Sequence, residues 1–426
     1  MKAALARRIG QHYAFVAATI VFLALLVSAG LRSAPGVMIV PLERAFGWSR
    51  DTISLSAAVG IFLYGLAGPF AAALMQRLGI RRVLLGALSL MAVATAVSLW
   101  MRTPAQLVLT WGVLTGLGSG CVATVLGAAV VNRWFAKRRG LMMGLLTASA
   151  ATGTLVFMPF LAMLAQSGGW KPVAWAVSIA CAALVPLTFW LLPEHPSDVG
   201  LRPFGADAES PAATAAASRG NPLQTALGTL ALALRRRDFW LLFATFFICG
   251  FTTNGLIGTH FIALCSDRGL AEVQAAGLLA AMGAFDLVGT TLSGWLTDRY
   301  DPRKLLFVYY GLRGLSLIYL PFSDFSFYSL GIFTVFYGLD WIATVPPTVR
   351  LANESFGEHD APVVFGWIVA GHQLGAACAA FFAGAMRTVQ GDYFYAFIIS
   401  GCAGIVASVL AVRVARGRDR EAVATA

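Results

Sequence analysis

The chain has 426 residues, of which 58% are hydrophobic and only 12% are charged. Soluble domains carry about 25% charged residues, so this composition excludes an ordinary soluble protein and indicates an all-α protein that crosses the membrane many times. Lys and Arg outnumber Asp and Glu by 31 to 20, and such an excess indicates either nucleic-acid binding or membrane topology.

Twelve apolar runs in the sequence are long enough to cross a bilayer, which requires roughly 20 residues. A polar segment, residues 193–237, separates the first six from the last six, and its Ala-, Ser-, Thr- and Pro-rich middle predicts a flexible linker. We therefore expect an N-terminal half, residues 1–192, and a C-terminal half, residues 238–426. The predicted spans are Tyr13–Val40, Ile53–Met75, Val83–Met101, Gln106–Val131, Leu141–Leu164, Trp170–Leu192, Phe239–Ala263, Val273–Leu296, Lys304–Phe322, Ser326–Val349, Ala361–Met386 and Tyr393–Val412.

The basic residues cluster in alternate loops. Most of the 31 Lys and Arg residues fall on the side of the membrane that holds the amino terminus. This positive-inside pattern predicts that both termini are cytoplasmic, and it excludes nucleic-acid binding because the basic excess is topological. We expect a monomeric, multi-pass protein of the bacterial cytoplasmic (inner) membrane.

The sequence contains no pattern typical of a metal site, a nucleotide site or an enzyme. The six cysteines lie in or at the ends of apolar runs, without metal-ligand spacing. No Gly-x4-Gly-Lys-Ser/Thr motif occurs, so ATP-driven transport has no support. Acids and histidines stand singly in separate spans, so we expect no catalysis, no cofactor and no metal.

Arg32 lies inside the first apolar run, where a charge costs at least a few kcal/mol unless it faces water, a partner or a substrate. Gly30, Pro35 and Gly36 weaken the helix around it, which is tolerated where a helix lines a cavity. Two interpretations stay open. Arg32 either snorkels or neutralises a structural carboxylate, or it binds an anion in a transport pathway.

Two loops, residues 72–82 and 294–304, align without a gap, and each carries a basic cluster into the next helix. The matching residues are Arg77, Gly79, Arg81 and Arg82 in the first copy, and Gly294, Asp298, Arg299, Arg303 and Lys304 in the second. Here the chain resembles the major facilitator superfamily, whose loops hold a glycine, Asp-Arg, a glycine and paired basic residues. The resemblance implies two six-helix halves held together in one state by a cytoplasmic charge latch. Gln76 replaces the acid of the first copy.

Residues 132–140 and 196–205 narrow the resemblance to the branch of monocarboxylate transporters and oxalate/formate exchangers. In monocarboxylate carriers the eighth helix holds an aspartate and, one turn later, an arginine. Asp286 fills the first place here, and Thr290 the second. The lysine of their first helix also finds no match, so the resemblance implies that the positive charge comes from elsewhere, with Arg32 and Arg313 as candidates.

Other polar residues fall within the predicted spans of the second half. For Arg313 we favour a structural ion pair with Asp340 or Asp286 over a substrate contact or a lipid-facing side chain, because an unpaired buried arginine is costly. Histidine as a residue type titrates near physiological pH, so His260 and His372 are each either a proton carrier or a packing residue. Further candidates for the substrate site are Tyr64, Asn254, Tyr337, His372 and Gln373.

The tenth span carries the pair Pro346-Pro347. Proline removes a backbone donor and disrupts a helix, so the pair predicts a bend near the cytoplasmic end of this span. A bend at this place is what a gate requires.

These patterns predict a secondary transporter of a small organic anion, a mono- or dicarboxylate, coupled to protons and working by alternating access. Arg32 would bind the carboxylate, and Asp286 would take and release the proton with the help of His260 or His372. One alternative is a drug or hydrophobic-metabolite exporter, although the fifth helix lacks the Gly-Pro repeat of drug/proton antiporters. The other is a non-transporting membrane sensor, for which we expect a large signalling domain that the tails and linker are too short to hold.

Overall fold

The computed structural model describes residues 8–206 and 222–415. Within these ranges nearly every segment is helical, and the β-structure is one isolated bridge between Phe135 and Phe204. The middle of the predicted linker, residues 207–221, and both terminal segments lie outside the described residues. The predicted positions of the two termini therefore stay a prediction.

Twelve helical segments are long and apolar enough to cross a membrane, as the sequence predicts. The protein is an integral, multi-pass membrane protein with the predicted all-α fold. The helices of the first six spans are α2 (Tyr13–Phe46), α3 (Arg50–Leu78), α4 (Ile80–Val97), α5 (Pro104–Leu107), α6 (Thr115–Cys121), α7 (Thr124–Trp134), α8 (Arg139–Gly168) and α9 (Trp170–Leu191). Those of the last six are α11 (Arg237–Gly250), α12 (Gly258–Asp267), α13 (Glu272–Thr297), α14 (Pro302–Phe322), α15 (Phe327–Asp340), α16 (Val345–Gln390) and α17 (Phe394–Ala411).

Two spans contain a π-helical segment that the sequence does not predict. In the fourth span η3 (Val108–Leu114) joins α5 to α6, and in the seventh η5 (Phe251–Ile257) joins α11 to α12. Such turns shift the helix register and are frequent at functional sites. Their positions draw attention to Trp111 and Asn254, which lie near the centres of η3 and η5.

The tenth and eleventh spans share the long helix α16. Gly357 interrupts this helix with φ 79°, ψ 156°, a conformation that residues with a Cβ rarely adopt. The tenth span covers Phe327–Gly357 and the eleventh covers Asp360–Gln390. The paired prolines do not bend a continuous helix: the tenth span breaks before them, and they open α16 in its first turn, where proline is tolerated.

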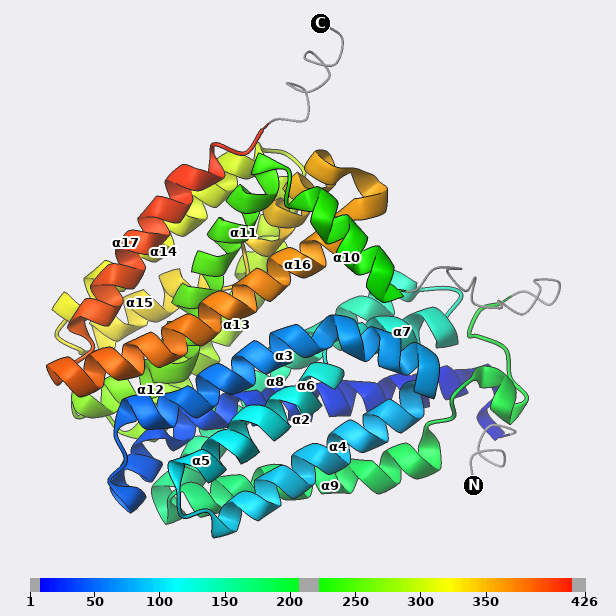
Figure 1. Ribbon diagram of the computed structural model, residues 1–426, viewed down its shortest axis with the longest axis horizontal. Coiled ribbons are helices and arrows are strands. Elements are labelled where there is room, and N and C mark those ends of the chain that lie inside the picture. Colours follow the sequence, from blue (N-terminus) through cyan, green and yellow to red (C-terminus); the bar gives the residue numbers. More distant parts are fainter. Residues whose placement is uncertain (1–7, 207–221, 416–426) are drawn as a thin grey trace, which may run out of the picture.

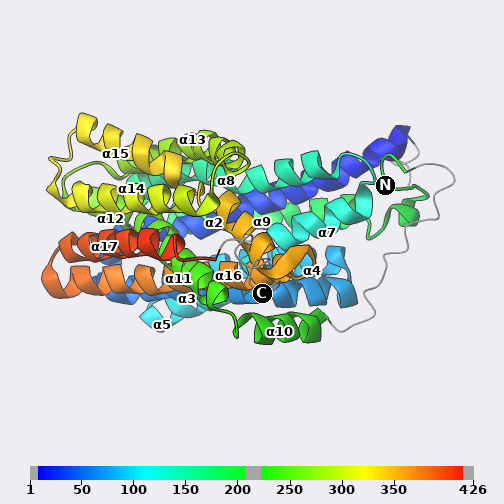
Figure 2. The same ribbon diagram turned by 90° about the horizontal axis from the view of Figure 1, so that it is seen from above.

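The helices form two groups, α2–α9 and α11–α17 (Figure 1). Between the groups α3 packs along α16, α2 along α12 and α8 along α13. The short helix α10 (Pro222–Ala233) contacts both α16 and α3, and Figure 2 shows it on the outer surface of the bundle. The domain boundaries at residues 192/193 and 237/238 stay predictions.

Close contacts between helices depend on glycine. A Cβ on Gly289 of α13 would lie 1.8 Å from the carbonyl oxygen of Leu339 on α15, and one on Gly375 of α16 would lie 2.0 Å from that of Phe247 on α11. Lipid tails are as apolar as the side chains, so spans associate through close packing of small residues rather than through the hydrophobic effect. Large apolar side chains such as Phe327, which is 83% exposed, instead cover the outside of the bundle.

Candidate functional site

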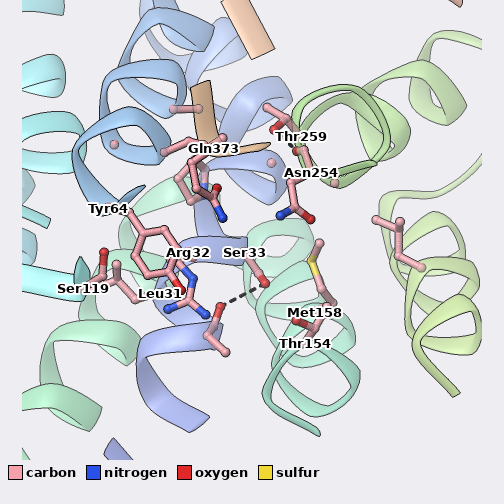
Figure 3. Close-up of a pocket in the computed structure, with 18 of the residues that line it drawn as sticks. Leu31, Arg32, Ser33, Tyr64, Ser119, Thr154, Met158, Asn254, Thr259 and Gln373 are labelled. Atoms are coloured by element: carbon pink, nitrogen blue, oxygen red, sulfur yellow. Dashed lines mark hydrogen bonds between the residues drawn. The ribbon is translucent and has the colours of Figure 1, made fainter. Parts of the chain in front are cut away.

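A cavity of about 260 Å³ lies between the two groups of helices. Its wall combines one arginine and one aspartate with aromatic, amide and hydroxyl side chains. Figure 3 shows Arg32 among several of these side chains. The polar and aromatic residues of the wall are Arg32, Ser33, Tyr64, Trp111, Thr115, Ser119, Thr154, Asn254, Thr259, Asp286, Trp341 and Gln373. Because they come from both halves, a molecule bound here would touch both.

Arg32 projects into this cavity from the middle of α2. Its Nη1 donates to Ser28 Oγ at 2.9 Å, and its guanidinium carbon lies 4.5 Å from the centroid of the Tyr64 ring. None of the salt bridges found among the described residues includes Arg32. Its charge is thus held by a hydroxyl and an aromatic face, and its remaining N–H donors face the cavity.

Two amide side chains stand near Arg32 in the other half. Asn254 lies in η5, where Thr259 Oγ1 donates to its backbone carbonyl at 2.9 Å. Gln373 comes from α16 and packs so closely on α3 that a Cβ on Gly65 would lie 2.4 Å from its own Cβ. Figure 3 shows Asn254 and Gln373 around the same open space as Arg32 and Tyr64. Neutral donors and acceptors from one half therefore face a cation from the other.

Asp286 of α13 forms another part of the wall and is 4% exposed. Its Oδ1 accepts two hydrogen bonds, from Thr290 Oγ1 at 2.9 Å and from the backbone N–H of Ile342 at 2.8 Å. Thr290, which stands where the resembling carriers have an arginine, thus donates to the acid one turn away.

Three predicted site residues lie outside the cavity wall described above. Tyr337 is fully buried and donates to the carbonyl of Thr252 at 2.7 Å. The ring of His372 packs 5.1 Å from that of Phe246. His260 is also fully buried. The cavity therefore brings together five of the predicted residues, which are Arg32, Tyr64, Asn254, Asp286 and Gln373.

Arg313 is 1% exposed and does not line the cavity either. Its Nε donates to Asp340 Oδ2 at 2.6 Å, and its Nη1 lies 2.9 Å from Cys249 Sγ. Of the two partners that the sequence suggests, Asp340 forms the ion pair. Neither residue of the pair lines the cavity.

Sequence reasoning missed a polar network that joins the halves at the opposite end of the bundle from the predicted latch. Arg50 of α3 donates to both oxygens of Asp267, at 2.7 and 2.5 Å, and to Tyr393 Oη at 3.1 Å. Tyr393 Oη in turn lies 3.2 Å from Nδ1 of His260, whose Nε2 lies 2.7 Å from the carbonyl of Ala380. The only signals in the sequence were single charged residues at the ends of spans. A single sequence does not show which of these residues pair with one another.

Several latch residues have contacts within their own half. Arg81 Nη2 donates to the carbonyl of Phe189 at 2.7 Å, while Glu194 accepts from the backbone N–H of Arg81 and pairs with Arg133. In the second half Arg303 pairs with Asp301 at 2.9 Å, and Arg299 lies 4.0 Å from the Trp295 ring centroid. Gly79, with φ 90°, leaves room for Glu194, whose carboxylate a Cβ would meet. The latch across the halves stays a prediction for another conformation.

The chain is similar to known membrane transporters. The family model of the Major Facilitator Superfamily matches residues 21–348 and 287–425. Monocarboxylate transporter 13 of Rattus norvegicus is 27% identical over 389 residues, which are 89% of this chain and 83% of that protein. The uncharacterized MFS-type transporter YcxA of Bacillus subtilis (strain 168) is 26% identical over 338 residues, 74% of each chain. The gallate transporter of Pseudomonas putida is 26% identical over 314 residues, 67% of this chain and 66% of that protein.

Solved structures show the same fold. A D-xylose-proton symporter superposes with a TM-score of 0.74 at 14% identity, covering 95% of this chain and 98% of that chain. A bacterial homolog of the human lysosomal transporter Spinster, in an inward-facing and occupied conformation, gives a TM-score of 0.72 at 14% identity, covering 95% and 96%. The chain therefore belongs to the Major Facilitator Superfamily, and it is a transporter of this family with monocarboxylate and gallate transporters among its relatives.

Proposed function

We propose that this protein is a secondary transporter of a small organic monocarboxylate, coupled to protons and working by alternating access. The observation that carries the proposal is Arg32, a cation in the wall of a central cavity with no ion-pair partner among the described residues. A charge within a membrane span is costly unless it faces water, a partner or a substrate, and an anionic substrate would supply the partner that Arg32 lacks. The names of two relatives, a monocarboxylate transporter and a gallate transporter, agree with an organic anion.

A monocarboxylate fits this wall better than a dicarboxylate. Arg32 and Asp286 are the acidic and basic side chains among the described residues that line the cavity. A second carboxylate would face neutral amides such as Gln373 and the acid itself, and like charges that share a dry site repel each other. The amides instead suit a neutral hydroxyl or carbonyl group on the same substrate.

Asp286 is the proton site in this proposal. It shares the cavity with Arg32, so loading an anion and a proton together leaves the closed cavity nearer to charge balance than loading either alone. His260 and His372 lie outside the wall, so neither meets the substrate in this conformation. We also propose cytoplasmic termini from the positive-inside pattern, and a bacterial cytoplasmic membrane in line with bacterial relatives.

An exporter of hydrophobic compounds would leave Arg32 without an anionic partner in the cavity, which disfavours that alternative. A thermal-shift screen of the purified protein against monocarboxylates, dicarboxylates and neutral hydrophobic compounds tests the proposal. A ligand that binds only the folded state raises the melting temperature by mass action. We expect stabilisation by monocarboxylates that carry a hydroxyl or carbonyl group and less by dicarboxylates of the same length. Stabilisation by neutral hydrophobic compounds alone would contradict it.

A further inference from the structure

The tenth span is interrupted inside the membrane. Helix α15 ends at Asp340, residues 341–344 form turns, and α16 begins at Val345. Pro346 and Pro347 lack backbone N–H groups, so two carbonyls of the turn region lose the partners that a continuous helix would supply. Non-helical backbone at membrane depth is tolerated only where other groups satisfy it. The partners of these backbone groups are therefore informative.

The carbonyls of Ile342 and Ala343, which the two prolines leave without helical partners, accept hydrogen bonds from other donors. The carbonyl of Ile342 accepts from the N–H of Val345 at 2.9 Å, within the turn. The carbonyl of Ala343 accepts from the hydroxyl of Ser293 on α13 at 2.5 Å. One contact from α13 thus already holds the break.

Arg313 of α14 donates hydrogen bonds to the two preceding carbonyls. Its Nη2 donates to the carbonyl of Asp340 and to that of Trp341, the latter at 3.2 Å. Its Nε pairs with the carboxylate of Asp340, so the charge is balanced and the fork of donors is free to grip the backbone. A planar guanidinium can make these contacts together, whereas an ammonium cannot.

Asp286 holds the same break from the cavity side. Its Oδ1 accepts the N–H of Ile342 at 2.8 Å, which belongs to the same peptide group as the Trp341 carbonyl that Arg313 binds. The break is thus gripped between a cation on one side and an acid on the other. Among the ionisable groups on the neighbouring helices, Arg32 lines the same cavity as Asp286, and Arg313 contacts Asp340 and Cys249. His372 lies on α16 beside Phe246, and His260 on α12 belongs to the Arg50 network.

Trp341, the first residue of the break, lines the cavity. Its ring stands edge-on to that of Tyr337, with centroids 5.7 Å apart. The single peptide group on its C-terminal side offers its carbonyl to Arg313 and its N–H to Asp286. The position of an aromatic wall of the substrate space therefore depends on both side chains.

We propose that Arg313 is a positioning residue, which fixes the break so that protonation of Asp286 is transmitted to the Trp341 ring in the cavity. This inference rests on the proposed role of Asp286 as the proton site. A neutral carboxyl accepts a hydrogen bond more weakly than a carboxylate does, so proton loading loosens the Ile342 contact. Arg313 keeps the carbonyl of the same peptide group fixed, so this peptide group turns about that carbonyl when its N–H is released, and the turn moves the Trp341 ring.

Fluorine NMR of the full-length protein, labelled with 5-fluorotryptophan, tests the proposal without a substrate. The chain has 11 tryptophans, and Trp341→Phe assigns the resonance concerned. In the wild-type protein we expect this resonance to move by more than its linewidth between acidic and alkaline buffer. In Asp286→Asn, which mimics the protonated acid, it should keep the acidic position in both buffers.

Arg313→Lys retains the charge beside Asp340 but loses the fork, so the pH response of Trp341 should disappear. Ser293→Ala is the matched control, because it removes a contact with the same break and leaves Arg313 and Asp286 in place. A wild-type response in Arg313→Lys, or loss of the response in Ser293→Ala, would overturn the proposal. If Arg313→Lys yields no monodisperse protein, the Asp286→Asn spectrum decides, and a resonance that still moves with pH overturns it.

The outcomes separate this inference from the proposed function. Loss of proton-driven accumulation in Asp286→Asn, together with a pH-insensitive wild-type Trp341, would overturn the transmission and leave the proton role intact. Retained accumulation in Asp286→Asn, with Trp341 still responding through Asp286, would overturn the proton role and leave the transmission intact.

Discussion

Arg50 and Asp267 join the two halves of the protein through a bidentate ion pair at one end of the bundle. Arg50 belongs to α3, is only 5% exposed, and reaches both carboxylate oxygens of Asp267 at the end of α12, at 2.7 and 2.5 Å. Arg387 pairs with the same carboxylate at 2.8 Å, and Arg44 pairs with Glu272 across the halves at 3.0 Å. With the orientation we propose, these contacts close the outer mouth of the transporter.

Asp267→Asn should open this end. The change leaves a buried guanidinium with a weaker partner, at a cost on the order of 2–5 kcal/mol, and that loss favours the conformation in which the halves part here. The measurement is labelling of Ser33→Cys, a cavity position, with a membrane-impermeant thiol reagent from the outside. The exposed Cys378 and Cys402 are replaced beforehand.

Glu43→Gln provides the matched control. Glu43 accepts from the same Arg50 at 2.9 Å, but it lies in the same half, on α2. Its loss should weaken Arg50 locally without freeing one half from the other. Equal outside labelling in Asp267→Asn and in the parent protein, or an equal rise in both variants, would argue against an outer gate at this pair.

Arg32→Gln should remove the stabilisation by carboxylates. The substitution keeps a side chain that can donate hydrogen bonds but deletes the charge, so the loss is on the order of 2–5 kcal/mol of binding free energy. Thermal shift at a fixed carboxylate concentration measures it, with Arg102→Gln in an exposed loop as the control. An undiminished shift in Arg32→Gln would return this arginine to a structural role.

Glu194→Gln should lower the thermal stability of the protein. The carboxylate accepts from the N–H groups of Ile80 and Arg81 at the start of α4, at 2.7 and 2.9 Å, and pairs with Arg133. Hydrogen bonds to a charged group contribute about 1.5–3 kcal/mol.

Glu354→Gln is the comparison for Glu194→Gln, because its pair with Arg350 is an exposed contact along one helix, which contributes only about 0.3–0.5 kcal/mol. Melting temperatures of the two variants should therefore differ clearly. Equal losses would mean that Glu194 does not organise the start of α4.

The spans and the principal cavity charges could be predicted from the sequence, because both depend on the free energy of moving a side chain between water and the bilayer. An apolar run of sufficient length has to cross the bilayer, and a charge inside such a run, as at Arg32 or Asp286, needs a reason to be there. The network around Arg50 follows a different logic. Its partner Asp267 is distant in the chain, and only the packing of the halves brings the two together.

The same limit applies to local geometry. Asn254 was a candidate on its polarity, yet the π-helical turn that carries it has no sequence pattern that distinguishes it from a regular helix. Tyr337 and His372 were reasonable cavity candidates because they lie in spans of the expected kind. Their side chains point into helix contacts instead, since the rotation of each helix about its axis depends on packing that a single sequence does not show.

Asp286→Asn should separate exchange from accumulation. The amide mimics the protonated acid and cannot release a proton, so accumulation driven by an imposed pH gradient should be lost. Counterflow, in which external and internal substrate exchange, does not require that release and should persist. Uptake of a labelled carboxylate from the thermal-shift screen into proteoliposomes measures both processes in one preparation.

Thr290→Val is the control for Asp286→Asn, since it removes a hydroxyl that donates to the same Oδ1 but keeps the acid. Because the N–H of Ile342 still binds that oxygen, proton-driven accumulation should survive in Thr290→Val, with at most a reduced rate. If Asp286→Asn also accumulates substrate in response to the gradient, Asp286 is not the coupling residue. The next candidates for the coupling residue would then be His372, which lies beside Phe246, and His260. The hydrogen bonds from His260 through Tyr393 to Arg50 would connect its protonation to the opening of the outer end.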